Sequence, residues 1–283
     1  MNNIKYAMHL VRRACLQPRT VLIFCMLAVY VSPCLADGYA AIGQYGVRLN
    51  LWGQFACVMS NEQVMLMCFA GYLMLLSDLP FWSRGSMYEA MRVKPMRATL
   101  VRIAAVLALT ALYLIGLLAM VCLLGGCFDF SFHQWDKMSF SAARQQLGDA
   151  FVMIVPQEIV LDYTPWAAFS IAMRQIALVF TGMGCLLLFC LLAMPMKKAV
   201  FAAFALWGGL DIAVDWMGLG YRMYAFSPVS WARMTIVIGK AYNDYYPSWQ
   251  WCTAGAAILC LAALLLLVCL PNKRQWYRRP LNR

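Results

Sequence analysis

The stretch Ile103–Gly126 reads IAAVLALTALYLIGLLAMVCLLGG and contains no charged side chain. A helix needs about 20 apolar residues to cross a bilayer core of about 30 Å, and this stretch meets that requirement. Comparable apolar stretches lie on both sides of it. The six predicted spans are Thr20–Ala36, Phe55–Leu76, Ile103–Gly126, Ile176–Met194, Ala199–Leu219 and Cys252–Leu270. We therefore expect an all-α, polytopic membrane protein with six transmembrane helices.

The composition supports a membrane protein and leaves little room for a soluble domain. A soluble domain is about 45–50 % apolar and about 25 % charged. Here 64 % of the residues are hydrophobic and 12 % are charged. Because the longest segment between predicted spans is only Cys127–Gln175, residues 1–283 are expected to form one transmembrane domain.

Positive charge is unevenly distributed among the segments that connect the predicted spans. Alternate segments, including both ends of the chain, hold 16 of the 23 Lys and Arg residues. Such an excess is typical of cytoplasmic segments, so both termini and the basic tail 271–283 are expected in the cytoplasm. The 16 residues are Lys5, Arg12, Arg13, Arg19, Arg84, Arg92, Lys94, Arg97, Arg102, Lys197, Lys198, Lys273, Arg274, Arg278, Arg279 and Arg283.

The net charge of +11 is explained by the same distribution. Lys and Arg beside a span fix its orientation and attract anionic lipid. We therefore expect the cell (inner) membrane as the location and membrane lipid as a partner, and no nucleic acid.

Residues 1–18 precede the first span and are expected to form an amphipathic helix lying in the membrane surface. Apolar and basic side chains recur on opposite sides of this helix. The apolar residues are Ile4, Met8, Val11 and Cys15, and the polar ones are Lys5, His9, Arg12 and Arg13. The alternative is a cleaved signal peptide, because the short apolar run Val21–Val31 is followed by small residues. We expect the first span to be retained, since an amphipathic start has no use in a discarded peptide.

The motifs that identify most enzymes are absent from the sequence. It has no G-x-x-x-x-G-K-[ST], G-x-S-x-G or H-E-x-x-H pattern, so it is not expected to be an enzyme or to hydrolyse ATP itself. Twelve cysteines include no C-x-x-C pair, so neither a metal site nor a cofactor is expected. A disulfide between outer cysteines remains an alternative, with Cys34, Cys57, Cys127 and Cys252 as candidates.

Three carboxylates lie within predicted spans: Glu62, Asp211 and Asp215. A charge at the centre of a spanning helix costs roughly 2.5–3.5 kcal/mol on insertion scales. Asp211 and Asp215 are four residues apart and share one helix face. The small residues Ala205, Gly209 and Ala213 form a stripe about 140° away, which is expected to pack closely on a neighbouring helix.

These carboxylates belong to the outer half of the predicted membrane domain. Arg174 at the mouth of the fourth span and Arg222 just past the fifth lie at the same depth. The five residues are expected to form an intramembrane polar cluster. It is either a structural set of ion pairs that holds spans together or the polar lining of an exit path. A proton relay is disfavoured, because the carboxylates do not continue to the inner side.

Two of the predicted loops have distinctive compositions. The outer loop Gly220–Gln250 is rich in Tyr and Trp and contains the apolar piece Met234–Ile238, which is too short to span. This is typical of re-entrant or surface-lying segments. The inner segment Trp82–Arg102 is the largest cytoplasmic loop. Its charges either anchor the topology or present a docking surface.

The topology resembles that of type-2 ATP-binding-cassette (ABC) permeases. The shared features are a surface helix, six spans with both ends inside, a docking-sized loop between the second and third spans, and a membrane-dipping outer segment before the last. The stretch Leu76-Ser77-Asp78-Leu79-Pro80-Phe81, followed by Tyr88, Arg92 and Arg97, is similar to that of small bacterial permeases for peptide or antibiotic export and self-immunity. One departure is the long outer segment Cys127–Gln175.

The resemblance implies a partner and an assembly. The stretch near Arg84–Arg97 would be the coupling helix that docks on a separate ABC ATPase, and two permease chains, identical or related, would pair. The docking residues implied are Asp78, Arg84, Tyr88, Glu89, Arg92 and Arg97. The alternative function is a stand-alone protein without an ATPase partner, either a secondary transporter coupled through Glu62, Asp211 or Asp215 or a membrane immunity protein.

Overall fold

The computed structural model describes residues 3–46, 48–77, 95–125, 128–143, 157–193, 196–238 and 244–269. Helices dominate this part of the chain. Its strands are β1 (Leu49–Asn50) and β2 (Phe128–Asp129), which pair in parallel with Leu49 opposite Phe128. The helices are α1 (Asn3–Cys15), α2 (Pro18–Tyr45), α3 (Leu51–Ser60), α4 (Glu62–Ser77), α6 (Pro95–Gly125), α7 (Lys137–Ala143), α8 (Gln157–Asp162), α9 (Pro165–Ala193), α10 (Met196–Ala203), α11 (Gly209–Asp215), α12 (Met234–Ile238) and α13 (Trp249–Cys269).

Four helices in the described residues contain stretches long and apolar enough to cross a membrane. These stretches are Pro18–Ala36, Thr99–Gly125, Pro165–Leu191 and Trp249–Val268. The prediction of a mostly helical, multi-pass membrane protein is confirmed at this level.

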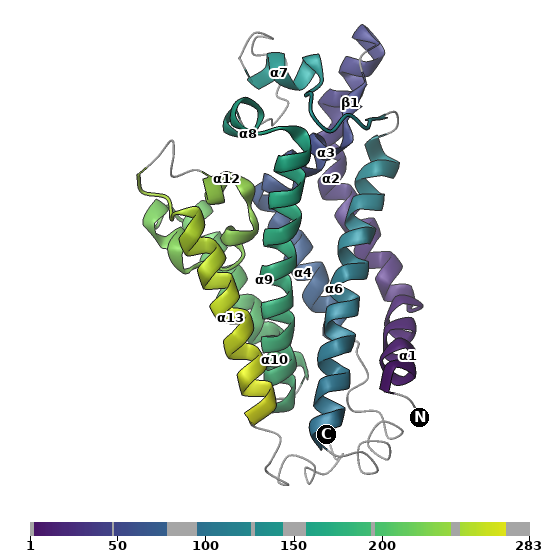
Figure 1. Ribbon diagram of the computed structural model, residues 1–283, viewed down its shortest axis with the longest axis vertical. Coiled ribbons are helices and arrows are strands. Elements are labelled where there is room, and N and C mark those ends of the chain that lie inside the picture. The colour runs from purple at the N-terminus through teal and green to yellow at the C-terminus, as the bar shows by residue number, and fades with distance from the viewer. Residues whose placement is uncertain are drawn as a thin grey trace.

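The long helices stand side by side, and α9 lies near the middle of the bundle (Figure 1). It packs against α13, α3 and α6, while α2 packs against α4 and α6. We call the end of the bundle that carries α3, α7 and α8 the upper end, and the end where α6 begins and α9 ends the lower end (Figure 1).

The centre of the bundle contains buried tyrosines whose hydroxyls are hydrogen-bonded. Tyr72 of α4 stacks on Phe180 of α9 with ring centres 5.0 Å apart, and its hydroxyl lies 2.6 Å from that of Thr110. Tyr113 of α6 donates to the Cys68 carbonyl at 2.7 Å. A buried hydroxyl without a partner would be costly, so these bonds allow polar side chains between apolar helices.

The upper end carries a cap built from the segment 128–143 against the start of α3. Asn50 caps α3 by accepting from the Gly53 amide at 3.0 Å and donates to the Ser131 carbonyl at 2.6 Å. Asp136 accepts from the Asn50 amide at 3.1 Å and from the Ser139 amide at 2.7 Å. These bonds hold two segments together that are more than 80 residues apart in sequence.

The predicted second span, Phe55–Leu76, is two helices rather than one. Asn61 lies between α3 and α4 in an extended conformation. Its side-chain oxygen accepts from the amides of Gln63 at 3.0 Å and Val64 at 3.1 Å. An Asn at this position satisfies amides at the start of a helix, so it ends one helix and begins the next.

The predicted fifth span, Ala199–Leu219, is a composite helix. It runs through α10, the π-helical segment Phe204–Gly208 and α11, and it ends at Asp215. Phe204 stacks on Phe69 in the middle of α4, with ring centres 6.3 Å apart. Single π-helical turns of this kind are frequent at functional sites.

The buried side of helix α1 matches only in part the apolar side that the sequence predicts. Leu10, Val11 and Ala14 are buried, whereas Met8 and Cys15 are exposed. The helix lies against α6 and continues the course of α2 along the bundle (Figure 1). Its predicted position in the membrane surface stays a prediction.

The cysteines considered for an outer disulfide are unpaired where they are described. Cys34, Cys57 and Cys252 are free thiols, and Cys127 lies outside the described residues.

Candidate functional site

A buried arginine, Arg233, lies among three carboxylates near the upper end of the bundle. Its terminal nitrogens donate to both oxygens of Asp215, at 2.9 and 3.1 Å. Its guanidinium also lies 3.8 Å from Asp211 and 3.9 Å from Glu62. We call Glu62, Asp211, Asp215 and Arg233 the Arg233 cluster.

Three separate parts of the chain supply these residues. Asp211 and Asp215 stand one turn apart on α11, and both reach Arg233 from the same helix face. Arg233 follows the 3-10 turn Ser230–Ala232 and directly precedes α12. Glu62 is the first residue of α4, where the positive end of the helix dipole favours a carboxylate.

Neighbouring hydroxyls complete the hydrogen bonding of the two aspartates. Ser230 donates to Asp211 Oδ1, and Ser227 donates to the same oxygen at 3.4 Å. The Tyr224 hydroxyl donates to Asp215 Oδ1, and the Tyr224 ring lies under the Arg233 guanidinium at 5.2 Å. Trp231 donates from its indole nitrogen to the Tyr224 carbonyl at 2.9 Å and so fixes this turn.

The cluster is mostly shielded from solvent. The side chains of Arg233 and Asp215 are 4 % and 2 % exposed, whereas that of Glu62 is 45 % exposed. Burial lowers the pKa of Arg233, but the neighbouring Asp211 and Asp215 outweigh this effect and raise it. Burial, together with the bond to Asp215, also raises the pKa of the Tyr224 hydroxyl. Because its own pKa is raised, the Arg233 guanidinium is charged at any physiological pH.

The charges in the cluster do not balance, because one guanidinium faces three carboxyl groups. The buried Nε of Arg233 has no hydrogen-bond partner among the described residues. Within the same residues no group of His, Cys, Asp and Glu side chains is suited to a metal ion. Because Arg233 contacts carboxylates of both α11 and α4, the arrangement supports a clamp that holds these two helices to the segment before α12.

The two other residues expected in the polar cluster lie elsewhere. Arg174 of α9 stacks over the ring of Trp249 at 4.7 Å, and Arg222 stacks over Tyr245 at 5.3 Å. Both aromatic partners lie at or just before the start of α13. The structure therefore brings Glu62, Asp211 and Asp215 together, and it separates Arg174 and Arg222 from them.

Two residues of the small-residue stripe on the predicted fifth span, Ala205 and Gly209, are not packed closely against another helix in the described part of the chain. Ala205 is exposed, and a Cβ built at Gly209 would meet no described atom within 4 Å. The π-helical segment interrupts the stripe between Ala205 and Gly209. The buried side of this helix instead carries Ala203, Trp207 and Asp211.

The residues predicted for ATPase docking lie almost wholly outside the described part of the chain. Arg97 belongs to the first turn of α6, but its side chain is not described. The basic tail 271–283 also falls outside the description. The others that fall outside it are Asp78, Arg84, Tyr88, Glu89 and Arg92.

Arg233 is the one member of the cluster that sequence reasoning missed. Two signals point to it in the sequence. It is flanked by the apolar runs Trp231-Ala232 and Met234–Ile238, and three carboxylates within predicted spans favour a nearby positive charge.

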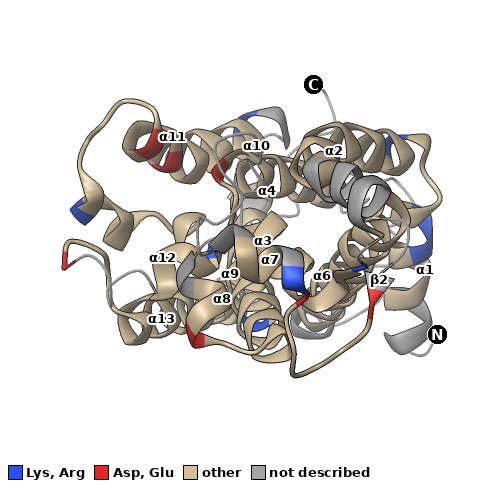
Figure 2. Cartoon of the chain, turned by 90° about the horizontal axis from the view of Figure 1, so that it is seen from above, with Lys and Arg blue, Asp and Glu red and all other residues tan. Residues whose placement is uncertain are grey.

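Seen from above, acidic residues gather on α11 at one side of the bundle (Figure 2). Comparisons of the chain with protein-family models, with curated proteins and with solved structures find no match.

Proposed function

We propose that the chain is the membrane-spanning permease subunit of an ABC transporter. It would export a peptide, an antibiotic or another amphipathic substrate, with ATP hydrolysed by a separate subunit. The observation that carries this proposal is the match between helix direction and charge. Helices α6 and α10 begin, and helices α9 and α13 end, at the lower end of the bundle, where the sequence places basic segments (Figure 1).

The six spans of the proposal include two that are not single long helices. The second would be α3 with α4, and the fifth would be α10 through α11. Antiparallel packing supports this pairing, because Phe204 meets Phe69 in mid-helix while Asp215 reaches the cluster at the start of α4. With α2, α6, α9 and α13, these give an even number of crossings and cytoplasmic termini.

The lower end would then present the segment 84–97 to the cytoplasm, where nucleotide is available. Five of the 16 predicted cytoplasmic Lys and Arg residues lie between residues 84 and 102. The chain has no nucleotide-binding motif of its own, so a transport cycle driven by ATP needs a partner. Movement of the partner would be passed to α6, which continues directly from this segment.

The Arg233 cluster would act as a structural clamp on the outer side. Asp211 is 1 % and Arg233 is 3 % exposed, which favours ion pairing over a water-lined path. The clamp ties the 3-10 turns of residues 221–232 to the end of the fifth span. Substrate release would require these turns to move with α11 or to separate from it.

The proposal is tested by ATP hydrolysis and transport in membranes that contain this chain and a candidate ABC ATPase subunit. Reversing Arg92 and Arg97 to Glu should reduce substrate-stimulated hydrolysis at least about tenfold, because it inverts the charge of the docking surface. Reversing Lys273 and Arg274 to Glu is the matched control, since it makes the same charge change in the cytoplasmic tail. The control should leave hydrolysis and transport intact. If the reversal of Arg92 and Arg97 also leaves both intact, the proposed docking role is wrong.

A secondary transporter is the second candidate, and the three carboxylates of the cluster are the observation that favours it. In that case Asp211→Asn combined with Asp215→Asn should abolish transport in a folded protein, while reversal of Arg92 and Arg97 should have no effect. An immunity protein would protect cells without any ATPase being present.

A further inference from the structure

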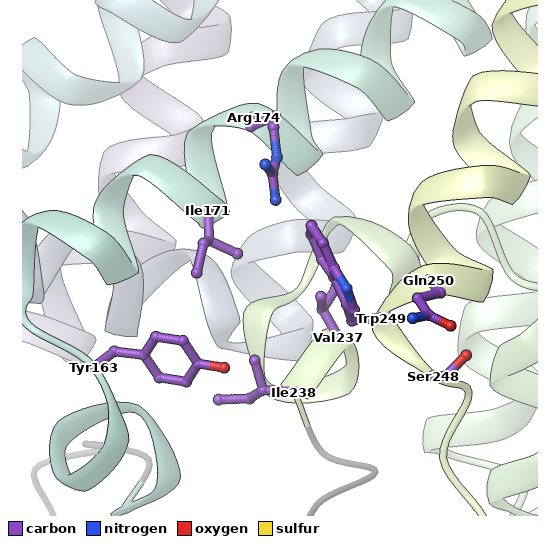
Figure 3. Close-up of a pocket in the computed structure, with 8 residues that line it drawn as sticks. All are labelled: Tyr163, Ile171, Arg174, Val237, Ile238, Ser248, Trp249 and Gln250. Carbon is purple, nitrogen blue, oxygen red and sulfur yellow. The ribbon is translucent and has the colours of Figure 1, made fainter.

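Beside α12 and the start of α13 lies a pocket of about 670 Å³ (Figure 3). Its volume falls in the range of about 300–1,000 Å³ that is usual for small-molecule sites. It is lined by Tyr163, Ile171, Arg174, Val237, Ile238, Ser248, Trp249 and Gln250. None of these residues belongs to the Arg233 cluster, so the pocket is a separate feature.

Among the described lining residues, Arg174 is the one that carries a formal charge. Its guanidinium points into the space between Ile171 and Trp249 (Figure 3). Among the described residues no carboxylate pairs with it, and its guanidinium carbon lies 4.7 Å from the centre of the Trp249 ring. A guanidinium held against an aromatic ring retains its outward N–H groups for an anion.

Neutral donors also line the pocket. The Tyr163 hydroxyl points into the same space, and Ser248 and Gln250 line the side nearest α13 (Figure 3). Ser248 also caps α13, since its hydroxyl oxygen accepts from the Trp251 amide at 3.2 Å. Its hydroxyl proton is thus left to donate, and the positive end of the helix dipole adds to the field. These groups all favour an acceptor-rich anion such as a carboxylate or a phosphate.

The remaining wall is apolar. Val237 and Ile238 are 1 % and 9 % exposed, and Ile171 is partly buried. Trp249 is the first residue of the apolar stretch Trp249–Val268, and a Trp in this position is typical of the membrane–water boundary. An apolar wall beside a cation at this boundary fits a ligand with an anionic head and an apolar body.

We propose that this pocket binds the carboxylate or phosphate head of an anionic amphiphile, with Arg174 as its counter-ion and Ile171, Val237 and Ile238 against its apolar part. The shared chemistry is that of an anionic phospholipid and of a free amphiphilic acid. The proposal goes beyond the transport function and does not require an ATPase.

The test is native mass spectrometry of the full-length chain in a neutral detergent, titrated with dodecyl phosphate. One molecule should bind to the parent chain, and dodecanol at the same concentration should not. Arg174→Gln should weaken binding at least about tenfold, since it removes a charge-assisted hydrogen bond. Arg174→Lys, which keeps the charge, should retain part of the affinity.

The matched control is Arg222→Gln, because Arg222 also stacks on an aromatic ring but does not line this pocket. It should bind dodecyl phosphate like the parent chain. Displacement by phosphatidylglycerol would identify a lipid as the source of the ligand, and its failure to displace would identify a free amphiphilic acid.

Three results would overturn the proposal. They are equal binding by the parent chain and a folded Arg174→Gln variant, equal binding of dodecanol, and displacement by inorganic phosphate at the concentration of dodecyl phosphate. Because no ATPase is present, such a failure would leave the proposed transport function untouched.

Discussion

Arg233 and Asp215 form a two-bond ion pair, with Nη1 donating to Oδ2 at 2.9 Å and Nη2 donating to Oδ1 at 3.1 Å. The pair joins the end of α11 to the turn that precedes α12, across 18 residues of sequence. Two parallel bonds fix the orientation of both groups, which a single Lys–Asp contact would not do. The pair therefore sets where the aromatic segment 221–238 meets the helix bundle.

Loss of the arginine should be strongly destabilising. Arg233→Gln leaves the buried Asp211 and Asp215 without a counter-ion, and breaking a buried pair in this way costs about 3–5 kcal/mol. The unfolding temperature of the purified chain in detergent should fall well below that of the parent. The control is Arg222→Gln, which removes an exposed arginine and should leave the unfolding temperature nearly unchanged. Equal stability of Arg233→Gln and the parent would contradict the clamp.

The two partners should also be energetically coupled. If Arg233→Gln and Asp215→Asn each break the same pair, their combined effect on the free energy of unfolding should be smaller than the sum of the single effects. Contacting residues in one network show coupling of about 0.5–3 kcal/mol. Strict additivity in a double-mutant cycle would show that the pair contributes nothing as a unit.

The break in the second predicted span depends on one side chain. Asn61→Ala removes the cap on α4 and should destabilise the protein by about 1 kcal/mol. Asn61→Ser, which can still accept from the amides of α4, should recover most of that loss. If Ala and Ser at this position behave alike in thermal unfolding, the cap is not what separates α3 from α4.

A close approach of α9 to α4 and α6 is tested at Gly184. A Cβ there would overlap the Tyr72 hydroxyl and lie 2.8 Å from Val106 Cγ1. Gly184→Ala should therefore destabilise the chain, and adding Tyr72→Phe should relieve part of the effect by removing the hydroxyl. Gly209→Ala is the matched control, because its Cβ would meet nothing within 4 Å and Ala favours a helix by roughly 0.5–1 kcal/mol. Unfolding temperatures that rank the two substitutions the other way would refute this packing.

The long helices could be predicted from sequence because their apolar runs are uninterrupted. The predicted stretches Ile103–Gly126 and Cys252–Leu270 fall almost entirely within α6 and α13. Boundaries were less predictable. Helix α9 begins at Pro165, ahead of the predicted Ile176, since Thr164 caps it by accepting from the Ala167 amide at 3.3 Å. Arg174 is consequently an interior residue of the helix.

The break at Asn61 and the pairing of Arg233 with Asp215 could not be predicted from pattern alone. A single Asn in an apolar run is tolerated in many helices, and only its bonds to the Gln63 and Val64 amides identify it as a cap. Arg233 lies 18 residues after Asp215, a separation at which helical periodicity carries no information. The pairing depends on how the 3-10 turns fold back on α11.

Labelling of Ser86→Cys in intact cells tests most directly whether the basic segment between α4 and α6 faces the cytoplasm, as we propose. A membrane-impermeant maleimide should add no label to Ser86→Cys beyond that of the parent chain until the cells are opened. Lys137→Cys, at the exposed start of α7 on the opposite end of the bundle, should be labelled in intact cells. Labelling of Ser86→Cys from outside would contradict the topology and the proposed docking on an ATPase.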